Sequence, residues 1–193
     1  MKQAKRKAET KRRLQNAASK AFKSKGFYGV GVDGLSKQAE ATSGAFYAHL
    51  GSKKEAFIDV LARGLDDVKN TVPKYQSEFG EHWPQKFADY YLGQAHVNDL
   101  ECGCAMTALS PDVARGDDEE KKLFELKMES IVELIAEGIH EAPSSEDERA
   151  RAWAFLSTLV GGVTLARSVK SPLLAKNIAE SAKAAAVAWL LEK

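Results

Sequence analysis

The stretch LSKQAEATSGAFYAHLGSKKEAF, residues 35–57, predicts two short helices joined by a tight turn. Residues 35–39 form the first helix, residues 40–41 form the turn, and Thr42 or Ser43 is the N-cap of the second helix. Two helices joined by about three or four residues make a helix-turn-helix, whose second helix fits the major groove of DNA. The stretch therefore predicts a nucleic-acid-binding element.

Side chains that can bind phosphate surround the second helix of this element. A hydroxyl, an imidazole N–H and an ammonium group can each donate to a phosphate oxygen, which fixes a protein on the duplex without reading sequence. The candidates are Lys37, Tyr47, His49 and Lys53. Exposed backbone N–H groups at the start of the helix, which Thr42, Ser43 and Gly44 open, add a further phosphate contact.

Short side chains occupy the positions that would read bases. Ser43 can donate or accept at a base edge, and Ala45 or Ala48 can touch a thymine methyl group. Gly44 is unfavourable in a helix by about 1 kcal/mol relative to Ala, and a close approach to DNA is a physical reason for it. Because few long polar side chains are available to contact base edges, we expect DNA shape, or a basic arm at residues 2–7, to contribute to specificity as well.

Residues 10–57 resemble the DNA-binding signature of TetR/AcrR-type transcriptional regulators. The matching residues are Gly44, Tyr47, His49, Ser52 and Lys53. The resemblance implies a bacterial regulator, most often a repressor, that binds a palindromic operator as a homodimer and leaves it when a small apolar or amphipathic effector binds. It also implies that the tyrosine, histidine and lysine contact phosphate.

The chain departs from the family pattern at four positions. Glu40 stands where glycine is usual, Ala41 where valine or leucine is usual, and Leu50 where phenylalanine is common. Gly31 stands where threonine or serine often caps the preceding helix. The Glu40 difference bears on the geometry of the turn, and the Gly31 difference removes one expected phosphate contact.

The charge of the chain is unevenly distributed. Residues 1–56 hold 13 Lys and Arg against 4 Asp and Glu, a net charge of +9, whereas residues 57–193 hold 15 against 23, a net charge of −8. A concentrated positive surface supplies the salt-sensitive, sequence-independent part of DNA affinity through counterion release. Because the basic segment also carries the helix-turn-helix, we expect it to face DNA.

Hydrophobic spacing predicts an all-α chain of about nine helices, without strands. We expect a three-helix DNA-binding domain at 1–56 and an effector-binding and dimerisation domain at 57–193. The expected helices cover about 9–25, 32–39, 43–50, 52–73, 84–96, part of 98–116, 117–137, 147–169 and 171–191. Proline and glycine predict the breaks at Pro73, Pro111, Gly116 and Pro143.

The second domain carries two further sets of candidate residues. Aromatic and sulfur side chains suit the wall of an apolar effector pocket: Trp83, Phe87, Tyr90, Tyr91, Met106, Phe124, Met128 and Trp153, with His96 nearby. Small and apolar residues of the last two helices suit a two-fold dimer interface: Phe155, Leu159, Gly162, Val163, Ala182, Ala186 and Trp189. Either set is also compatible with an ordinary core.

Several other classes of protein are disfavoured. The chain has no apolar run of about 18 residues that would span a membrane, and its charged N-terminus is unlike a secretory signal. We therefore expect a cytoplasmic protein, with no cofactor and no metal. Four scattered histidines and the absence of catalytic motifs argue against an enzyme. A non-specific architectural DNA binder would share the basic segment.

Cys102 and Cys104 leave an alternative open. A thiol that senses oxidants or electrophiles needs an accessible thiolate of low pKa, but the nearby acidic residues Asp99 and Glu101 would raise a thiol pKa. A metal site with His96 would lack a fourth ligand. A pair of small buried residues at a helix start is the plainer interpretation.

Overall fold

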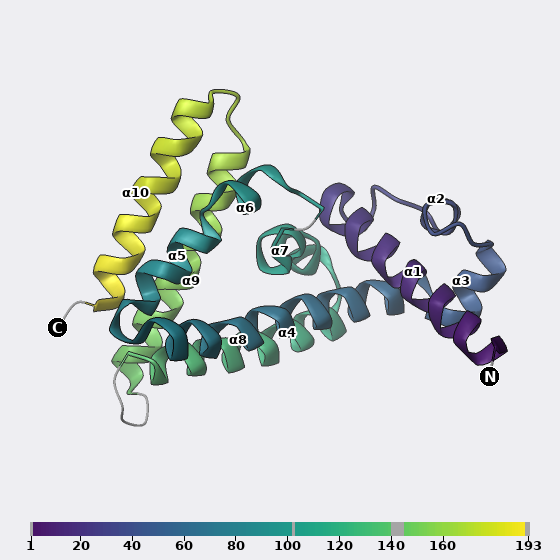
Figure 1. The fold of residues 1–193 in the computed structure, drawn as a ribbon, viewed down its shortest axis with the longest axis horizontal. Coiled ribbons are helices and arrows are strands. Elements are labelled where there is room, and N and C mark those ends of the chain that lie inside the picture. Colours follow the sequence, from purple (N-terminus) through teal and green to yellow (C-terminus); the bar gives the residue numbers. More distant parts are fainter. Residues whose placement is uncertain (1, 102, 140–144, 192–193) are drawn as a thin grey trace. The chain divides into compact units, whose positions relative to one another are not determined.

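The computed structural model describes residues 2–101, 103–139 and 145–191. Within these ranges it contains ten α-helices and one short 3-10 helix, with no strand (Figure 1). The predicted all-α fold is confirmed. Cys102 and the break predicted at Pro143 lie outside the described residues.

The helices follow one another with short connections. Their bounds are α1 (Lys2–Lys25), α2 (Val32–Gln38), α3 (Ser43–Leu50), α4 (Lys53–Phe79), the 3-10 helix η1 (Gly80–His82), α5 (Trp83–Tyr91), α6 (Gln94–Asn98), α7 (Ala105–Arg115), α8 (Asp118–Glu137), α9 (Glu146–Arg167) and α10 (Pro172–Leu191). Among the described helices, none has the length and apolar character needed to cross a membrane.

Contacts divide the chain into two compact units. The first unit contains residues up to 64 together with 100–121, and the second contains 65–99 together with the residues from 122 onwards. The long helices α4 and α8 therefore contribute residues to both units. The domain boundary expected after residue 56 stays a prediction.

The first unit is held by the apolar stripe of α1. Leu14, Ala18 and Phe22 are fully buried, and Leu35 of α2 and Phe46 of α3 pack into the same core. Buried leucine and phenylalanine side chains each contribute about 1.5–3 kcal/mol to folding. This core fixes α2 and α3 and leaves their opposite faces in solvent.

The second unit is built around aromatic rings. The ring of Phe87 in α5 lies 6.0 Å from Tyr91, 6.1 Å from Phe155 of α9 and 6.4 Å from Trp83, measured between centroids. Trp83 Nε1 donates to the carbonyl of Gly138 at 2.9 Å and thereby satisfies a carbonyl just beyond the C-terminal end of α8.

Helix α9 packs closely along α10 within the second unit (Figure 1). A Cβ atom at Gly162 would lie 2.6 Å from Cβ of Ala182, so only glycine permits this approach. Glycine at this position therefore sets the distance between the last two helices.

Four expectations about helix boundaries were wrong. Helix α1 begins at Lys2 rather than near Glu9, and α4 continues through Pro73 to Phe79. Pro73 is exposed, so its ring lies on the solvent side of the helix, while the buried Val72 keeps the segment packed. Pro111 is likewise exposed inside α7. The helix expected over 84–96 divides into α5 and α6 at Leu92 and Gly93.

Candidate nucleic-acid interface

The turn between α2 and α3 closes with a glutamate in the left-handed region. Glu40 has φ of +49°, and its N–H donates to the carbonyl of Lys37 at 3.1 Å. The N–H of Ala41 donates to the carbonyl of Ser36 at 2.9 Å. The two helices are therefore joined by residues 39–42 in a tight turn, although glutamate replaces the expected glycine.

Thr42, rather than Ser43, is the N-cap of α3. Its hydroxyl oxygen accepts from the N–H of Ala45 at 3.1 Å, and its backbone is extended. Such a cap contributes about 1 kcal/mol to helix stability. The hydroxyl of Ser43 instead donates to Oδ1 of Asp33 on α2 at 2.6 Å. Asp33 was not among the predicted residues, because nothing in its local sequence links it to a residue ten positions later.

One face of α3 is left to solvent. Phe46 and Leu50 are buried in the core of the first unit, whereas Gly44, Tyr47 and Ala48 are exposed. Tyr47 is 55% exposed, although large aromatic side chains are usually buried. This face offers a hydroxyl and a surface of small residues along one helix.

Gly44 is not required by the fold. A Cβ atom placed on it would have as its nearest neighbour the hydroxyl oxygen of Thr42 at 3.8 Å, an ordinary contact. Since glycine is unfavourable in a helix, its presence on this exposed face is consistent with close approach by another molecule. The remaining candidates on α3, Ala45 and His49, are half-buried.

Two adjacent lysines open α4 and differ in their surroundings. Nζ of Lys53 lies 4.3 Å from the centroid of the Phe27 ring, a cation–π contact. Nζ of Lys54 lies 2.6 Å from Asp117 and 2.8 Å from Glu119, and these hydrogen bonds raise the pKa of Lys54. The charge of Lys54 is therefore already compensated within the first unit.

The basic segment before this element is helical. Residues 3–9 of α1 are exposed and include Lys5, Arg6 and Lys7. An arm that is helical carries its charges around an axis and so differs from an extended strand of basic residues. Lys37 is also exposed, on α2.

Sequence comparison identifies the element. A sequence profile described as "Bacterial regulatory proteins, tetR family" matches residues 14–60, which contain the second half of α1, all of α2 and α3, and the start of α4. The HTH-type transcriptional repressor SCO4008 of Streptomyces coelicolor is 31% identical over 88 residues. The chain belongs to the TetR family. The alignment covers 46% of this chain and 45% of SCO4008, so it spans less than half of either protein.

Solved structures resemble this TetR-family chain over most of its length. The reduced form of NemR from E. coli has a TM-score of 0.75 at 19% identity, with 92% of this chain and 94% of NemR covered. SCO4454, a TetR-family transcriptional regulator from Streptomyces coelicolor, has a TM-score of 0.77 at 13% identity, with 95% of each chain covered. At these identities the likeness establishes the fold alone.

The residues predicted to line an effector pocket in this TetR-family chain are divided between the two units. Met106 is buried in the first unit, whereas the other seven belong to the second. Trp83, Phe87 and Tyr91 are buried among each other's rings, and Tyr90 and Trp153 are 45% and 39% exposed. Met128 is buried and Phe124 half-buried on α8. The effector pocket stays a prediction.

The predicted dimer residues fall largely on the inner side of α9 and α10. Phe155, Leu159 and Val163 are at most 1% exposed, and Gly162 and Ala186 are also buried. Their side chains pack within the second unit, and their role in a dimer interface stays a prediction. Trp189 is 55% exposed and Ala182 is half-buried.

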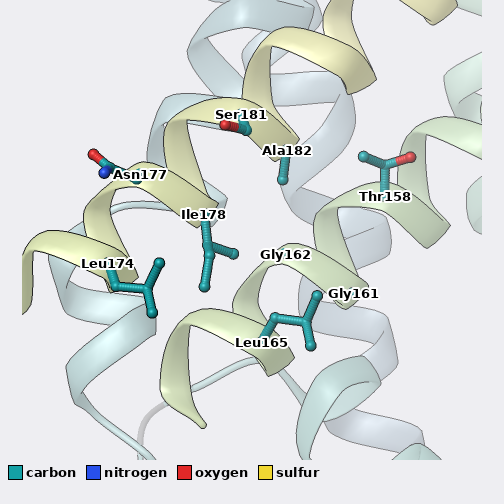
Figure 2. A pocket seen from close by; sticks show the side chains of 9 residues that line it. All are labelled: Thr158, Gly161, Gly162, Leu165, Leu174, Asn177, Ile178, Ser181 and Ala182. Atoms are coloured by element: carbon teal, nitrogen blue, oxygen red, sulfur yellow. The ribbon is translucent and has the colours of Figure 1, made fainter. Parts of the chain in front are cut away.

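The outward face of the same helices is apolar. Leu165 of α9 is 60% exposed and Leu174 of α10 is 48% exposed. They line a groove of about 620 Å³ between the two helices (Figure 2). Its lining consists of Thr158, Gly161, Gly162, Leu165, Leu174, Asn177, Ile178, Ser181 and Ala182. The hydrophobic periodicity of the sequence predicted apolar helices here. It did not predict which of the two apolar stripes faces outwards.

The alternative function, a thiol that senses oxidants or electrophiles, has little support in this TetR-family chain. Cys104 is 8% exposed at the N-terminus of α7, whereas a sensing thiolate must be accessible. Its partner in that hypothesis, Cys102, lies outside the described residues. Within the described residues, no group of three or more His, Cys, Asp or Glu is arranged to hold a metal ion.

Proposed function

We propose that this TetR-family chain is a transcriptional repressor that binds operator DNA as a homodimer and releases it when a small apolar or amphipathic effector binds. The observation that carries the proposal is the exposed face of α3, where Gly44, Tyr47 and Ala48 lie in solvent beside the capped N-terminus of the helix. A helix of this kind fits the major groove, with its first residues at the base edges.

The contacts sort into two kinds. Tyr47, His49 and Lys53 would bind phosphate and set the register of α3 on the duplex, as would Lys37 on α2. Ser43, Gly44, Ala45 and Ala48 would meet base edges. The net charge of +9 on residues 1–56 would add the salt-dependent part of the affinity.

Dimerisation would place two such helices on successive half-sites. An apolar groove with exposed leucines is unusual on a monomer, and a second copy of the same face would cover it. A two-fold interface needs such a self-complementary patch. In this proposal, the outward faces of α9 and α10 form the interface, around Leu165, Leu174 and Trp189.

Effector release would act through the helices that contribute to both units. Helix α4 begins at Lys53, beside α3, and ends at Phe79, close in sequence to the aromatic residues of α5. A ligand that binds one position of α4 more tightly than another would change the fraction of dimers that can bind DNA. The size of this change is set by the difference between its affinities for the two positions. The effector itself is to be sought by native mass spectrometry of the purified protein.

Selection from random duplexes followed by fluorescence anisotropy tests the proposal. We expect a palindromic consensus, a Kd at physiological salt at least about 1,000-fold lower for it than for bulk DNA, and a steep salt dependence. Equal affinity for consensus and bulk DNA would support a non-specific architectural binder instead. Absence of salt-sensitive binding to any duplex would contradict both functions.

A further inference from the structure

The hydrogen bond between Ser43 and Asp33 restricts what the first residue of α3 can recognise. Oγ of Ser43 donates to Oδ1 of Asp33 at 2.6 Å, which is the short distance expected when a hydroxyl donates to a carboxylate. Ser43 lies at the start of α3 and Asp33 in the first turn of α2. Asp33 is exposed and Ser43 half-exposed, so the pair lies on the surface of the element.

A serine hydroxyl carries a single proton and two lone pairs. A carboxylate can only accept, so a proton pointed away from Asp33 would leave two sets of oxygen lone pairs facing each other at 2.6 Å. The proton of Ser43 is therefore committed to Asp33. What Ser43 presents to any other molecule is an acceptor.

The major groove offers few donors to such an acceptor. Adenine presents its N6 amino group and cytosine its N4 amino group, whereas guanine and thymine present O6, N7 and O4, which are all acceptors. The negative charge of Asp33 acts in the same direction, because it repels phosphate oxygens and the acceptor edges of guanine. The pair therefore suits a base that carries an exposed amino group.

We propose that Asp33 is a positioning residue for specificity, which holds Ser43 as a hydrogen-bond acceptor and makes α3 select adenine or cytosine at one position of each half-site. This inference rests on the proposed function, since it assumes that the start of α3 meets base edges. If the hydrogen bond between Ser43 and Asp33 served only to hold α2 against α3, replacing Asp33 would leave the base preference unchanged.

The experiment compares the wild-type protein with Asp33→Asn on four duplexes that differ only at the selected base pair. An asparagine amide can accept or donate, so Ser43 regains its donor role in this variant. We expect the wild type to favour adenine or cytosine by about tenfold, the value of one hydrogen-bond difference. In Asp33→Asn, the ratio between the affinities for the favoured and the other bases at this position should fall close to one, while base preferences at all other positions persist.

Two further variants separate the explanations. Asp67→Asn makes the same charge change at an exposed site on α4 and should leave the ratio unaltered. Ser43→Ala should abolish the preference, and its persistence would assign the reading to Asp33 itself and overturn the proposal. Thermal unfolding of each variant establishes that the comparison concerns folded protein.

The possible failures are distinct. If the wild type binds no duplex at low salt, the proposed function and this inference fall together. If it binds a consensus without preferring adenine or cytosine at any position affected by Ser43→Ala, only the inference is overturned. An unchanged ratio in Asp33→Asn has the same consequence.

Discussion

The carboxylate of Glu40 lies 3.1 Å from the guanidinium of Arg13, and the same Glu40 has the only positive φ among the described non-glycine residues. The ion pair joins the turn of the helix-turn-helix to α1. It is weak support, because the side chain of Glu40 is 86% exposed and surface pairs of this kind contribute about 0–1 kcal/mol. The turn is thus strained at a position where glycine would be unstrained.

Replacing Glu40 by glycine should therefore stabilise the protein. The left-handed conformation is unfavourable for an L-residue by about 1–2 kcal/mol, and glycine removes this strain while adding some unfolded-state entropy. We expect a net gain of about 1 kcal/mol in the free energy of unfolding, measured by urea denaturation. Glu40→Ala is the matched control, since it loses the ion pair and keeps the strain, and it should not stabilise. A loss of stability in Glu40→Gly would contradict the account.

Gly44→Ala should lower the affinity for DNA without lowering the stability of the fold. The added methyl group meets no close neighbour in the chain, and alanine favours a helix by up to about 1 kcal/mol. We expect equal or higher stability together with an affinity for the consensus duplex reduced by about tenfold or more, because the methyl group enters the space between helix and DNA. Gly34→Ala adds the same group on α2 and should bind like the wild type. Unaltered affinity in Gly44→Ala would show that this face does not approach DNA closely.

Tyr47→Phe and Lys53→Ala should weaken binding to all sequences alike. Each removes a phosphate donor, and phosphate contacts carry no sequence information. For Lys53→Ala, the slope of log K against log salt should become shallower by about one unit. Lys54→Ala is the control, because Asp117 and Glu119 already hold that ammonium group, and its slope should stay close to the wild type. A loss confined to one base sequence would mean that the roles are misassigned.

Local signals predicted part of this structure well. Helix α3 covers residues 43–50 as expected, because an N-cap at Thr42 or Ser43 is a signal that acts within the first turn of the helix. Proline was a poorer guide. Pro73 and Pro111 lie inside helices, since tertiary packing of neighbouring residues outweighs the single backbone hydrogen bond that each removes.

The sequence did not predict contacts between residues that are far apart in the chain. The bond from Ser43 to Asp33 and the ion pairs of Lys54 depend on how helices are placed in space, which residue types do not specify. The choice of dimer residues from the sequence is subject to the same limit. Helix α9 has apolar residues around much of its circumference, so periodicity does not distinguish the inner stripe at Phe155 from the outer one at Leu165.

Leu165→Glu should convert the proposed dimer to a monomer. Leu165 is 60% exposed and lines the groove between α9 and α10, so a carboxylate there would be buried without a partner in a two-fold interface. Sedimentation velocity should show one species at the monomer mass of 21.1 kDa. Leu126→Glu, at a leucine 65% exposed on α8, is the matched control and should stay dimeric. A dimeric Leu165→Glu protein would exclude this groove from the interface.

Glu120→Gln should stabilise the protein at neutral pH. Glu120 is 7% exposed, and burial raises the pKa of its carboxyl above the ordinary value of 4.5, so the folded state favours the protonated form. A group of this kind contributes stability below its unfolded pKa and loses it as pH rises through the folded pKa. Glutamine stays neutral and keeps an oxygen that can accept from the N–H of Asp117, as Glu120 does at 3.0 Å.

The difference in unfolding free energy between Glu120→Gln and wild type should therefore be largest near pH 7, shrink as pH falls through the raised pKa of Glu120, and be smallest below about 4.5. The neighbouring Asp117 behaves oppositely, because hydrogen bonds with Glu120 and Lys54 lower its pKa, and the part that comes from Lys54 is lost on acidification in both proteins. Comparing the two proteins at each pH removes that shared term. Glu125→Gln, at an exposed site on the same helix, should show no such trend. A variant less stable than wild type at pH 7 would mean that the ionised Glu120 stabilises the capped start of α8.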